Sequence, residues 1–207
     1  MMKLQIALDT PLARSMEILQ KVRPYIDIAE IGTPQIFQSG INAVVEYHTA
    51  FPDLDLLADL KIMDAGQYEA EIGFNAGCKY VTVLGVASDD TIRGAVKAAK
   101  NAAGEIVVDM IEVKDLLQRS EQLLKLGVDY LCLHTAFDRQ KNEKAPLAAL
   151  LKVKTAFPQA KLAIAGGVGL DTIDQIAEIG PDIIIVGGAI TTAQNPAMIA
   201  KQLRERF

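Results

Sequence analysis

Short apolar runs and amphipathic segments alternate along the whole chain. Eight runs are almost continuously apolar, as expected for strands covered on both faces, and they predict strands at residues 4–8, 26–31, 54–58, 80–84, 106–111, 130–133, 162–165 and 183–186. Segments with helical spacing of apolar residues follow at residues 11–22, 41–50, 68–76, 88–101, 114–126, from about 146, from about 170, and up to 206. Eight such units predict a closed (β/α)8 barrel, a TIM barrel, that forms a single domain over residues 1–207. A doubly wound open sheet is the alternative, but no G-x-G-x-x-G turn follows the first run.

Composition and charge narrow the range of functions. The chain has 207 residues, and half of them are apolar, which is enough for one large core. A net charge of -5 without a basic stripe predicts no general binding to nucleic acid or to an anionic membrane. We expect a cytoplasmic protein, because the first residues lack the apolar core of a signal peptide and the apolar run at 183–190 is too short to span a bilayer. Cys78 and Cys132 have no nearby C-x-x-C or C-x-x-H partner, so buried free thiols are expected rather than a disulfide or a metal site.

Polar residues or glycine pairs stand at the end of each predicted strand. In barrels of this type, chemistry takes place at the rim formed by the carboxyl ends of the strands. In chain order this rim carries Asp9, Glu30, Asp59 with Lys61, Thr82, Asp109, His134, Gly166 with Gly167, and Gly187 with Gly188. Burial of an ionisable group without partners costs several kcal/mol, so the ionisable residues within the apolar runs are expected to converge on one pocket. Exposure to solvent at the rim would also explain some of these polar residues.

The densest charge pattern is Asp59-Leu60-Lys61-Ile62-Met63-Asp64. Alternate residues of a strand share a face, so Asp59 and Lys61 are expected to point the same way, with Asp64 in the following turn. Two carboxylates around an ammonium lower the cost of placing any of the three in a partly dry site. A solvated cluster at a strand exit is the simpler interpretation, and the D-x-K-x-x-D spacing alone does not decide between the two.

The remaining rim residues suggest a phosphate site, an acid–base group and a metal site. The two glycine pairs would let backbone N–H groups approach an anion after the seventh and eighth strands, where phosphate sites recur in this fold, although tight turns would explain one pair. His134 ends a strand at the rim, where a group that titrates near neutrality suits proton transfer, and a core histidine is the alternative. Glu30 and Asp59 offer the oxygen ligands that Mg²⁺ prefers, unless Glu30 only pairs with Lys61.

Taken together, these motifs resemble the 3-hexulose-6-phosphate synthase family within the orotidine-5′-monophosphate decarboxylase suprafamily. The resemblance covers essentially the whole chain and is carried by Ala7-Leu8-Asp9, Glu30-Ile31-Gly32-Thr33-Pro34, Ala58-Asp59-Leu60-Lys61-Ile62-Met63-Asp64-Ala65-Gly66, Val108-Asp109-Met110-Ile111, His134-Thr135, Ala163-Ile164-Ala165-Gly166-Gly167 and Val186-Gly187-Gly188. It implies a lyase of the aldehyde-lyase type that uses Mg²⁺ to condense formaldehyde with D-ribulose 5-phosphate. The product of this aldol reaction would be D-arabino-hex-3-ulose 6-phosphate.

The resemblance also implies roles for individual residues. Glu30 and Asp59 would bind the metal. His134 would move the C1 proton of the sugar to give a 1,2-enediolate, whose charge the metal and Lys61 would stabilise.

Substrate binding and assembly follow from the same resemblance. Asp9 and Asp109 would hold sugar hydroxyls, and the two glycine pairs would hold the phosphate. Asp64 would reach into the active site of a neighbouring subunit, which implies a homodimer with shared sites.

Two other functions compete with this interpretation. A 3-keto-L-gulonate-6-phosphate decarboxylase would share the enediolate chemistry, but that family typically has arginine just after the rim histidine and after the final glycine. This chain has Thr135 to Asp138 and Ala189 at those places, and aspartate at 109 where that decarboxylase tends to carry glutamate. A non-catalytic phosphosugar-binding barrel is the other alternative, but it has no need of a base beside a metal.

Overall fold

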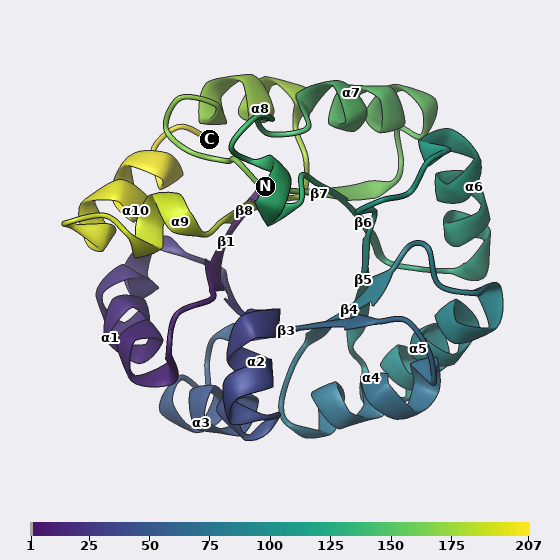
Figure 1. The fold of residues 1–207 in the computed structure, drawn as a ribbon, viewed down its shortest axis with the longest axis horizontal. Helices are drawn as coiled ribbons and strands as arrows, with labels where there is room; N and C mark the ends of the chain where they lie inside the picture. The colour runs from purple at the N-terminus through teal and green to yellow at the C-terminus, as the bar shows by residue number, and fades with distance from the viewer. Residues whose placement is uncertain (1) are drawn as a thin grey trace.

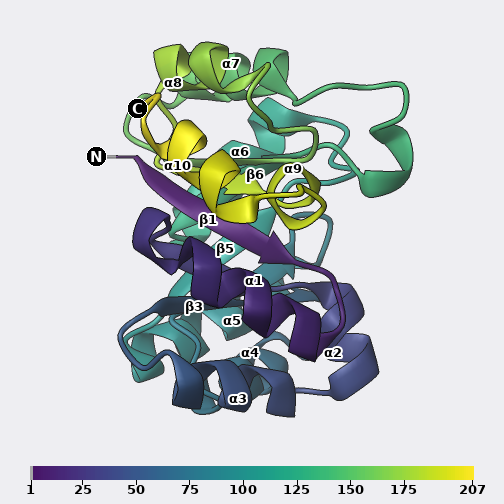
Figure 2. The same ribbon diagram turned by 90° about the vertical axis from the view of Figure 1, so that its left-hand side faces the viewer.

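The computed structural model describes residues 2–207, which form one closed barrel (Figure 1). The eight strands are parallel and pair in chain order, and β8 closes on β1. They are β1 (Lys3–Leu8), β2 (Ile28–Ile31), β3 (Asp55–Ile62), β4 (Tyr80–Leu84), β5 (Glu105–Asp109), β6 (Tyr130–His134), β7 (Lys161–Ala165) and β8 (Ile183–Val186). The helices surround this ring in Figure 1, and the side view of Figure 2 shows α1 and α10 packed across β1. The predicted (β/α)8 TIM barrel is therefore confirmed.

The outer helices begin and end close to the positions that the periodicity predicts. They are α1 (Leu12–Val22), α2 (Thr33–Ser39), α3 (Asn42–Ala50), α4 (Gly66–Asn75), α5 (Asp89–Ala102), α6 (Leu116–Leu126), α7 (Leu147–Ala156), α8 (Ile173–Ile179), α9 (Gly188–Thr191) and α10 (Pro196–Arg204), with short 3-10 turns at Arg23–Tyr25 and Phe137–Arg139. Ser88 caps α5 by accepting a hydrogen bond from the backbone N–H of Thr91, as its sequence position suggests.

The strands are apolar on both faces because each face packs against a different layer. Leu4, Ile6 and Leu8 of β1 point outward to the helices and are fully buried. Ile28, Leu57 and other alternate residues point into the barrel, where they form a second apolar cluster. This double burial is the physical reason why the strand runs read as continuous rather than alternating.

The structure adds one helix that was not expected and shifts the bounds of other elements, including the third strand, which continues to Ile62 rather than ending at residue 58. The helix α2 was not expected, because it has only seven residues and its proline is readily interpreted as a turn, although proline suits the first turn of a helix. The last helix is interrupted: α9 ends at Thr191, and α10 starts anew at Pro196, where Asn195 provides the cap. The fifth strand ends at Asp109 rather than at residue 111.

Two further expectations concern single residues and membrane contact. Cys78 and Cys132 are both free and buried, as expected. Within residues 2–207, no helix has both the length and the apolar character needed to cross a membrane.

Candidate active site

A cavity of about 890 Å³ opens at the carboxyl ends of the strands. Nearly all of the rim residues selected from the sequence line it, namely Asp9, Glu30, Asp59, Lys61, Asp109, His134, Gly166, Gly167, Gly187 and Gly188. Asp64 does not line it. The cavity is large enough for a small phosphorylated sugar.

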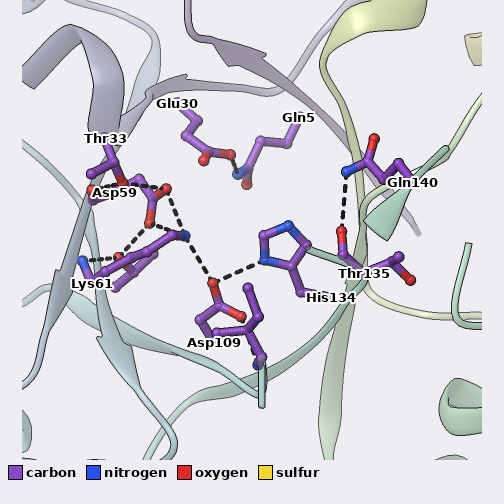
Figure 3. A network of polar contacts seen from close by, with 11 residues as sticks. Gln5, Glu30, Thr33, Asp59, Lys61, Asp109, His134, Thr135 and Gln140 are labelled. Atoms are coloured by element: carbon purple, nitrogen blue, oxygen red, sulfur yellow. Dashed lines mark hydrogen bonds and ion pairs between the residues drawn. The ribbon is translucent and has the colours of Figure 1, made fainter. Parts of the chain in front are cut away.

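Four charged or titratable side chains form a continuous chain of contacts across the cavity floor (Figure 3). The Nζ of Lys61 lies 2.9 Å from Oδ2 and 3.1 Å from Oδ1 of Asp59, and 2.9 Å from Oδ2 of Asp109. On the other side of Asp109, its Oδ2 lies 3.0 Å from Nδ1 of His134. Lys61 is thus paired with Asp59 and Asp109, and not with Glu30.

These contacts determine the charge states of Lys61 and Asp109. Burial disfavours the ammonium of Lys61, but the charges of Asp59 and Asp109 outweigh burial and raise its pKa. Burial also disfavours ionisation of Asp109, which is only 3 % exposed, but His134 and Lys61 lower its pKa to about 2. Asp109 is therefore an anion and Lys61 a cation at any physiological pH.

The ionised Asp109 also determines the tautomer of His134. Because a carboxylate only accepts hydrogen bonds, Nδ1 of His134 must carry the proton that is donated to Asp109. The lone pair of the neutral ring is then on Nε2. This arrangement suits His134 to act as a base. Asp109 is less suited to that role, because three of its four lone-pair positions already accept hydrogen bonds from Lys61, His134 and the backbone N–H of Ile111.

Two threonines hold the carboxylate of Asp59. The hydroxyl of Thr33 donates to Oδ2 at 2.8 Å, and that of Thr82 donates to Oδ1 at 2.8 Å. Thr33 begins the unexpected helix α2, and it was not selected from the sequence because it lies beyond the apolar run at 26–31. Its position in the Glu30–Pro34 string, three residues after a rim carboxylate, was the available signal.

Glu30 lies apart from the Lys61 chain and has its own partner. Its Oε2 accepts a hydrogen bond of 2.6 Å from Nε2 of Gln5, and both side chains are buried. Burial and the nearby charge of Asp59 raise the pKa of Glu30 well above its ordinary value. Gln5 was missed from the sequence, although a polar residue at an inward position of the apolar run Leu4 to Leu8 was a signal that could have found it.

Glu30 and Asp59 are suited to share a divalent cation. The mutual repulsion of the two carboxylates contributes to the raised pKa of Glu30, and a bound cation would remove this penalty. The four lone-pair positions of Asp59 all face donors, so a cation would have to replace one of the contacts with Lys61, Thr33 or Thr82. Within residues 2–207 no group of three or more His, Cys, Asp or Glu side chains could hold a metal, so water and substrate would complete the shell of Mg²⁺.

Asp9 lies at the mouth of the cavity, between two glycines. A Cβ on Gly32 would collide with Oδ1 of Asp9, and a Cβ on Gly187 would lie 3.9 Å from its Oδ2. Partial desolvation and the charge of Asp59 raise the pKa of Asp9, while Lys61 and His134 oppose this effect. Asp9 forms no ion pair within residues 2–207, which leaves its oxygens accessible to a ligand.

The two glycine pairs differ in whether the fold itself requires glycine. Gly166 and Gly167 have φ values of +82° and +71°, and a Cβ on Gly166 would collide with the carbonyl oxygen of Thr135. The turn itself therefore requires the first pair. A Cβ on Gly188 would have no atom within 4 Å, so the fold does not require glycine there, whereas a ligand that approaches the backbone would.

Asp64 is exposed on the outside of its own cavity. Its Oδ1 accepts a 2.7 Å hydrogen bond from the backbone N–H of Ala65, which has a φ of +50°. Large apolar side chains nearby in the sequence are also exposed, including Met63 at 53 % and Tyr68 at 69 %.

Comparisons with known proteins agree on one family. A family model described as the orotidine 5′-phosphate decarboxylase / HUMPS family matches residues 2–203. The 3-hexulose-6-phosphate synthase of Bacillus subtilis (strain 168) is 45 % identical over 205 residues, which cover 99 % of this chain and 98 % of the relative. A crystal structure of 3-hexulose-6-phosphate synthase from Salmonella typhimurium has a TM-score of 0.97 at 41 % identity and covers 99 % and 98 % of the two chains.

A related decarboxylase has the same fold at lower identity. The structure of 3-keto-L-gulonate-6-phosphate decarboxylase from Vibrio cholerae has a TM-score of 0.87 and 26 % identity. It covers 99 % of this chain and 96 % of its own.

Proposed function

Because the chain belongs to the orotidine 5′-phosphate decarboxylase / HUMPS family, we propose that this lyase condenses formaldehyde with D-ribulose 5-phosphate. The product would be D-arabino-hex-3-ulose 6-phosphate. The observation that carries the proposal is the chain of contacts Asp59–Lys61–Asp109–His134, which presents an oriented histidine and a fixed cation to one cavity.

The reaction begins with proton transfer from the sugar. Nε2 of His134 takes a proton from C1 of ribulose 5-phosphate, and the electron pair left behind is shared with the C2 oxygen in a 1,2-enediolate. The ammonium of Lys61 is held in place before the charge develops, so it stabilises the enediolate without reorganisation. C1 then forms a bond to the carbon of formaldehyde, and the proton on His134 passes to the former aldehyde oxygen.

Glu30 and Asp59 are the proposed ligands of Mg²⁺. When bound, the ion would supply positive charge beside the C1 and C2 oxygens of the sugar. Asp9 is placed to accept hydrogen bonds from sugar hydroxyls, and the backbone around Gly188 is open to the phosphate.

We also propose that the chain forms a homodimer in which Asp64 serves the partner's active site. This explains why a charged residue of the D-x-K-x-x-D string points away from its own cavity. The exposed apolar side chains of Met63, Tyr68 and Phe37 fit burial between two subunits.

A decarboxylase reaction on a sugar acid is less well supported. Among residues 2–207, Lys61 is the only lysine or arginine that lines the cavity. A substrate that carries a carboxylate as well as a phosphate needs more positive charge than this. The wall next to His134 instead presents Ala136 and the exposed ring of Phe137.

The decisive experiment measures two reactions of the purified protein in parallel. Formaldehyde consumption with ribulose 5-phosphate is followed with Mg²⁺ and with EDTA, and CO₂ release is followed with 3-keto-L-gulonate 6-phosphate. We expect metal-dependent loss of formaldehyde with negligible CO₂ release, and no turnover by His134→Ala although it still binds the sugar phosphate. Efficient CO₂ release with only weak condensation would assign the site to the decarboxylase instead.

A further inference from the structure

We propose that Thr82 is a positioning residue that holds both the main chain of Lys61 and the carboxylate of Asp59. The catalytic part of this inference rests on the proposed function, whereas the structural part concerns the free protein. Thr82 lies in the middle of β4, lines the cavity and is only 6 % exposed.

The strand that carries Lys61 is irregular at that residue. The ladder between β3 and β4 pairs Ala58 with Val81 and Ile62 with Val83. Asp59, Leu60 and Lys61 therefore lie opposite the single residue Thr82, which makes this segment a β-bulge.

The bulge places Lys61 in a costly backbone conformation. Its φ is +46°, in the left-handed region, which is unfavourable for a residue with a side chain. Such a conformation persists only where neighbouring groups hold it in place. The side chain of Lys61 nevertheless has to reach both Asp59 and Asp109, so the direction of its main chain matters for the cavity.

The hydroxyl of Thr82 supplies the bonds that the interrupted ladder lacks. The backbone N–H of Lys61 donates to Oγ1 of Thr82 at 2.9 Å, and the same oxygen donates its own proton to Oδ1 of Asp59 at 2.8 Å. Because the proton of the hydroxyl is used by Asp59, its lone pair must face Lys61. One atom therefore sets the direction of the Lys61 main chain and the orientation of Asp59 together.

A set of three substitutions separates this role from a general effect on packing. Thr82→Val keeps the shape of the side chain but leaves the Lys61 N–H and one oxygen of Asp59 without this partner. Thr82→Ser restores the hydroxyl in a smaller side chain. Thr33→Val is the matched control, because it removes the hydrogen bonds of a different hydroxyl to Asp59 and does not touch the amide of Lys61.

The first measurement is hydrogen exchange of the Lys61 amide by NMR in the free protein. We expect Thr82→Val to accelerate this exchange roughly fivefold, because that factor corresponds to the loss of a hydrogen bond of about 1 kcal/mol, whereas Thr82→Ser and Thr33→Val leave it near the wild-type rate. Equal acceleration by Thr33→Val, or no acceleration by Thr82→Val, would overturn the structural part. If Thr82→Val does not fold, Thr82→Ala replaces it in the same comparison.

The second measurement is the steady-state rate of formaldehyde condensation. For Thr82→Val we expect kcat to fall about 100-fold, because a displacement of about 1 Å of a catalytic group such as the Lys61 ammonium has an effect of this size. We expect little change in KM, because Thr82 does not hold the substrate. Thr82→Ser should recover most of the rate, and a wild-type kcat in Thr82→Val would refute the catalytic part. If the wild-type protein itself does not consume formaldehyde, the proposed function fails, whereas the exchange of the Lys61 amide still tests the role of Thr82.

Discussion

Replacement of Asp109 by asparagine tests the central ion pair of the cavity. In the wild type, Oδ2 of Asp109 accepts hydrogen bonds from Lys61 and His134, and Oδ1 accepts one from the backbone N–H of Ile111. An asparagine amide has one oxygen and one NH₂ group. Whichever way it turns, its NH₂ group faces a donor, so at least one buried contact becomes repulsive.

The loss of stability can be derived from the pKa of Asp109. Lowering this pKa from 3.8 to about 2 corresponds to about 2 kcal/mol of folding free energy at pH 7. Because the folded-state pKa is the lower one, this contribution is present above the unfolded pKa and is lost as the pH falls towards 2. We therefore expect Asp109→Asn to be about 2 kcal/mol less stable at pH 7, with the difference from wild type smaller by about 1 kcal/mol at pH 3.

The catalytic effect should exceed the effect on stability. If the NH₂ group of the asparagine faces His134, it favours the tautomer with its proton on Nε2, which is unable to accept the C1 proton. If the amide oxygen faces His134 instead, the neutral amide still removes the negative charge that stabilises the protonated ring. By analogy with other histidine–aspartate pairs, kcat should fall by roughly 10²–10⁴-fold.

The assay combines urea unfolding at pH 7 and pH 3 with initial rates of condensation. Asp138→Asn is the control, because it removes the same charge from an exposed residue at the mouth of the cavity. If Asp109→Asn keeps both the wild-type unfolding free energy and a kcat within about tenfold of wild type, Asp109 does not orient His134.

Three further predictions concern the metal and phosphate ends of the cavity. Gly188→Ala should keep the wild-type melting temperature but raise KM for ribulose 5-phosphate about tenfold. Gly166→Ala should lose about 1–3 kcal/mol of unfolding free energy in urea, and equal stability of the two variants would contradict the difference between the glycine pairs. Gln5→Met should weaken binding of Mn²⁺, measured by electron paramagnetic resonance, by about 10–100-fold, and unchanged affinity would mean that Gln5 does not orient Glu30. Glu30 has a raised pKa, so its stabilising contribution is lost as the pH rises through the folded-state pKa. Without divalent ions, Glu30→Gln should therefore have a higher melting temperature than wild type at pH 8 but not at pH 5, and equal melting temperatures at pH 8 would contradict this.

The architecture of the barrel and most residues of its rim could be predicted from the sequence alone. Strands covered on both faces must be apolar throughout, so Asp109 and His134 stand out as interruptions that need a common explanation. Both properties are local: they are read along one strand and need no knowledge of its neighbours.

The partners of these residues were decided only by the tertiary structure. The sequence left open whether Lys61 pairs with Glu30, and the closed barrel instead places its ammonium between Asp59 and Asp109. The bulge in β3 decides where the Lys61 side chain points, and the main chain of this bulge is hydrogen-bonded to Thr82 in the next strand. Contacts of this kind join residues 21 to 48 positions apart, and no periodicity along the chain encodes them.

The roles of the uncharged residues that contact the rim carboxylates could not be predicted from the sequence for a related reason. Gln5 and Thr33 matter only through the carboxylates that they contact, Glu30 and Asp59, and a glutamine or a threonine by itself predicts no chemistry. The sequence by itself thus determined which charges the rim carries, because burial makes them costly and therefore conspicuous. Only the closure of the sheet decided which of those charges meet, because hydrogen bonds between strands depend on register, bulges and the distance across the barrel.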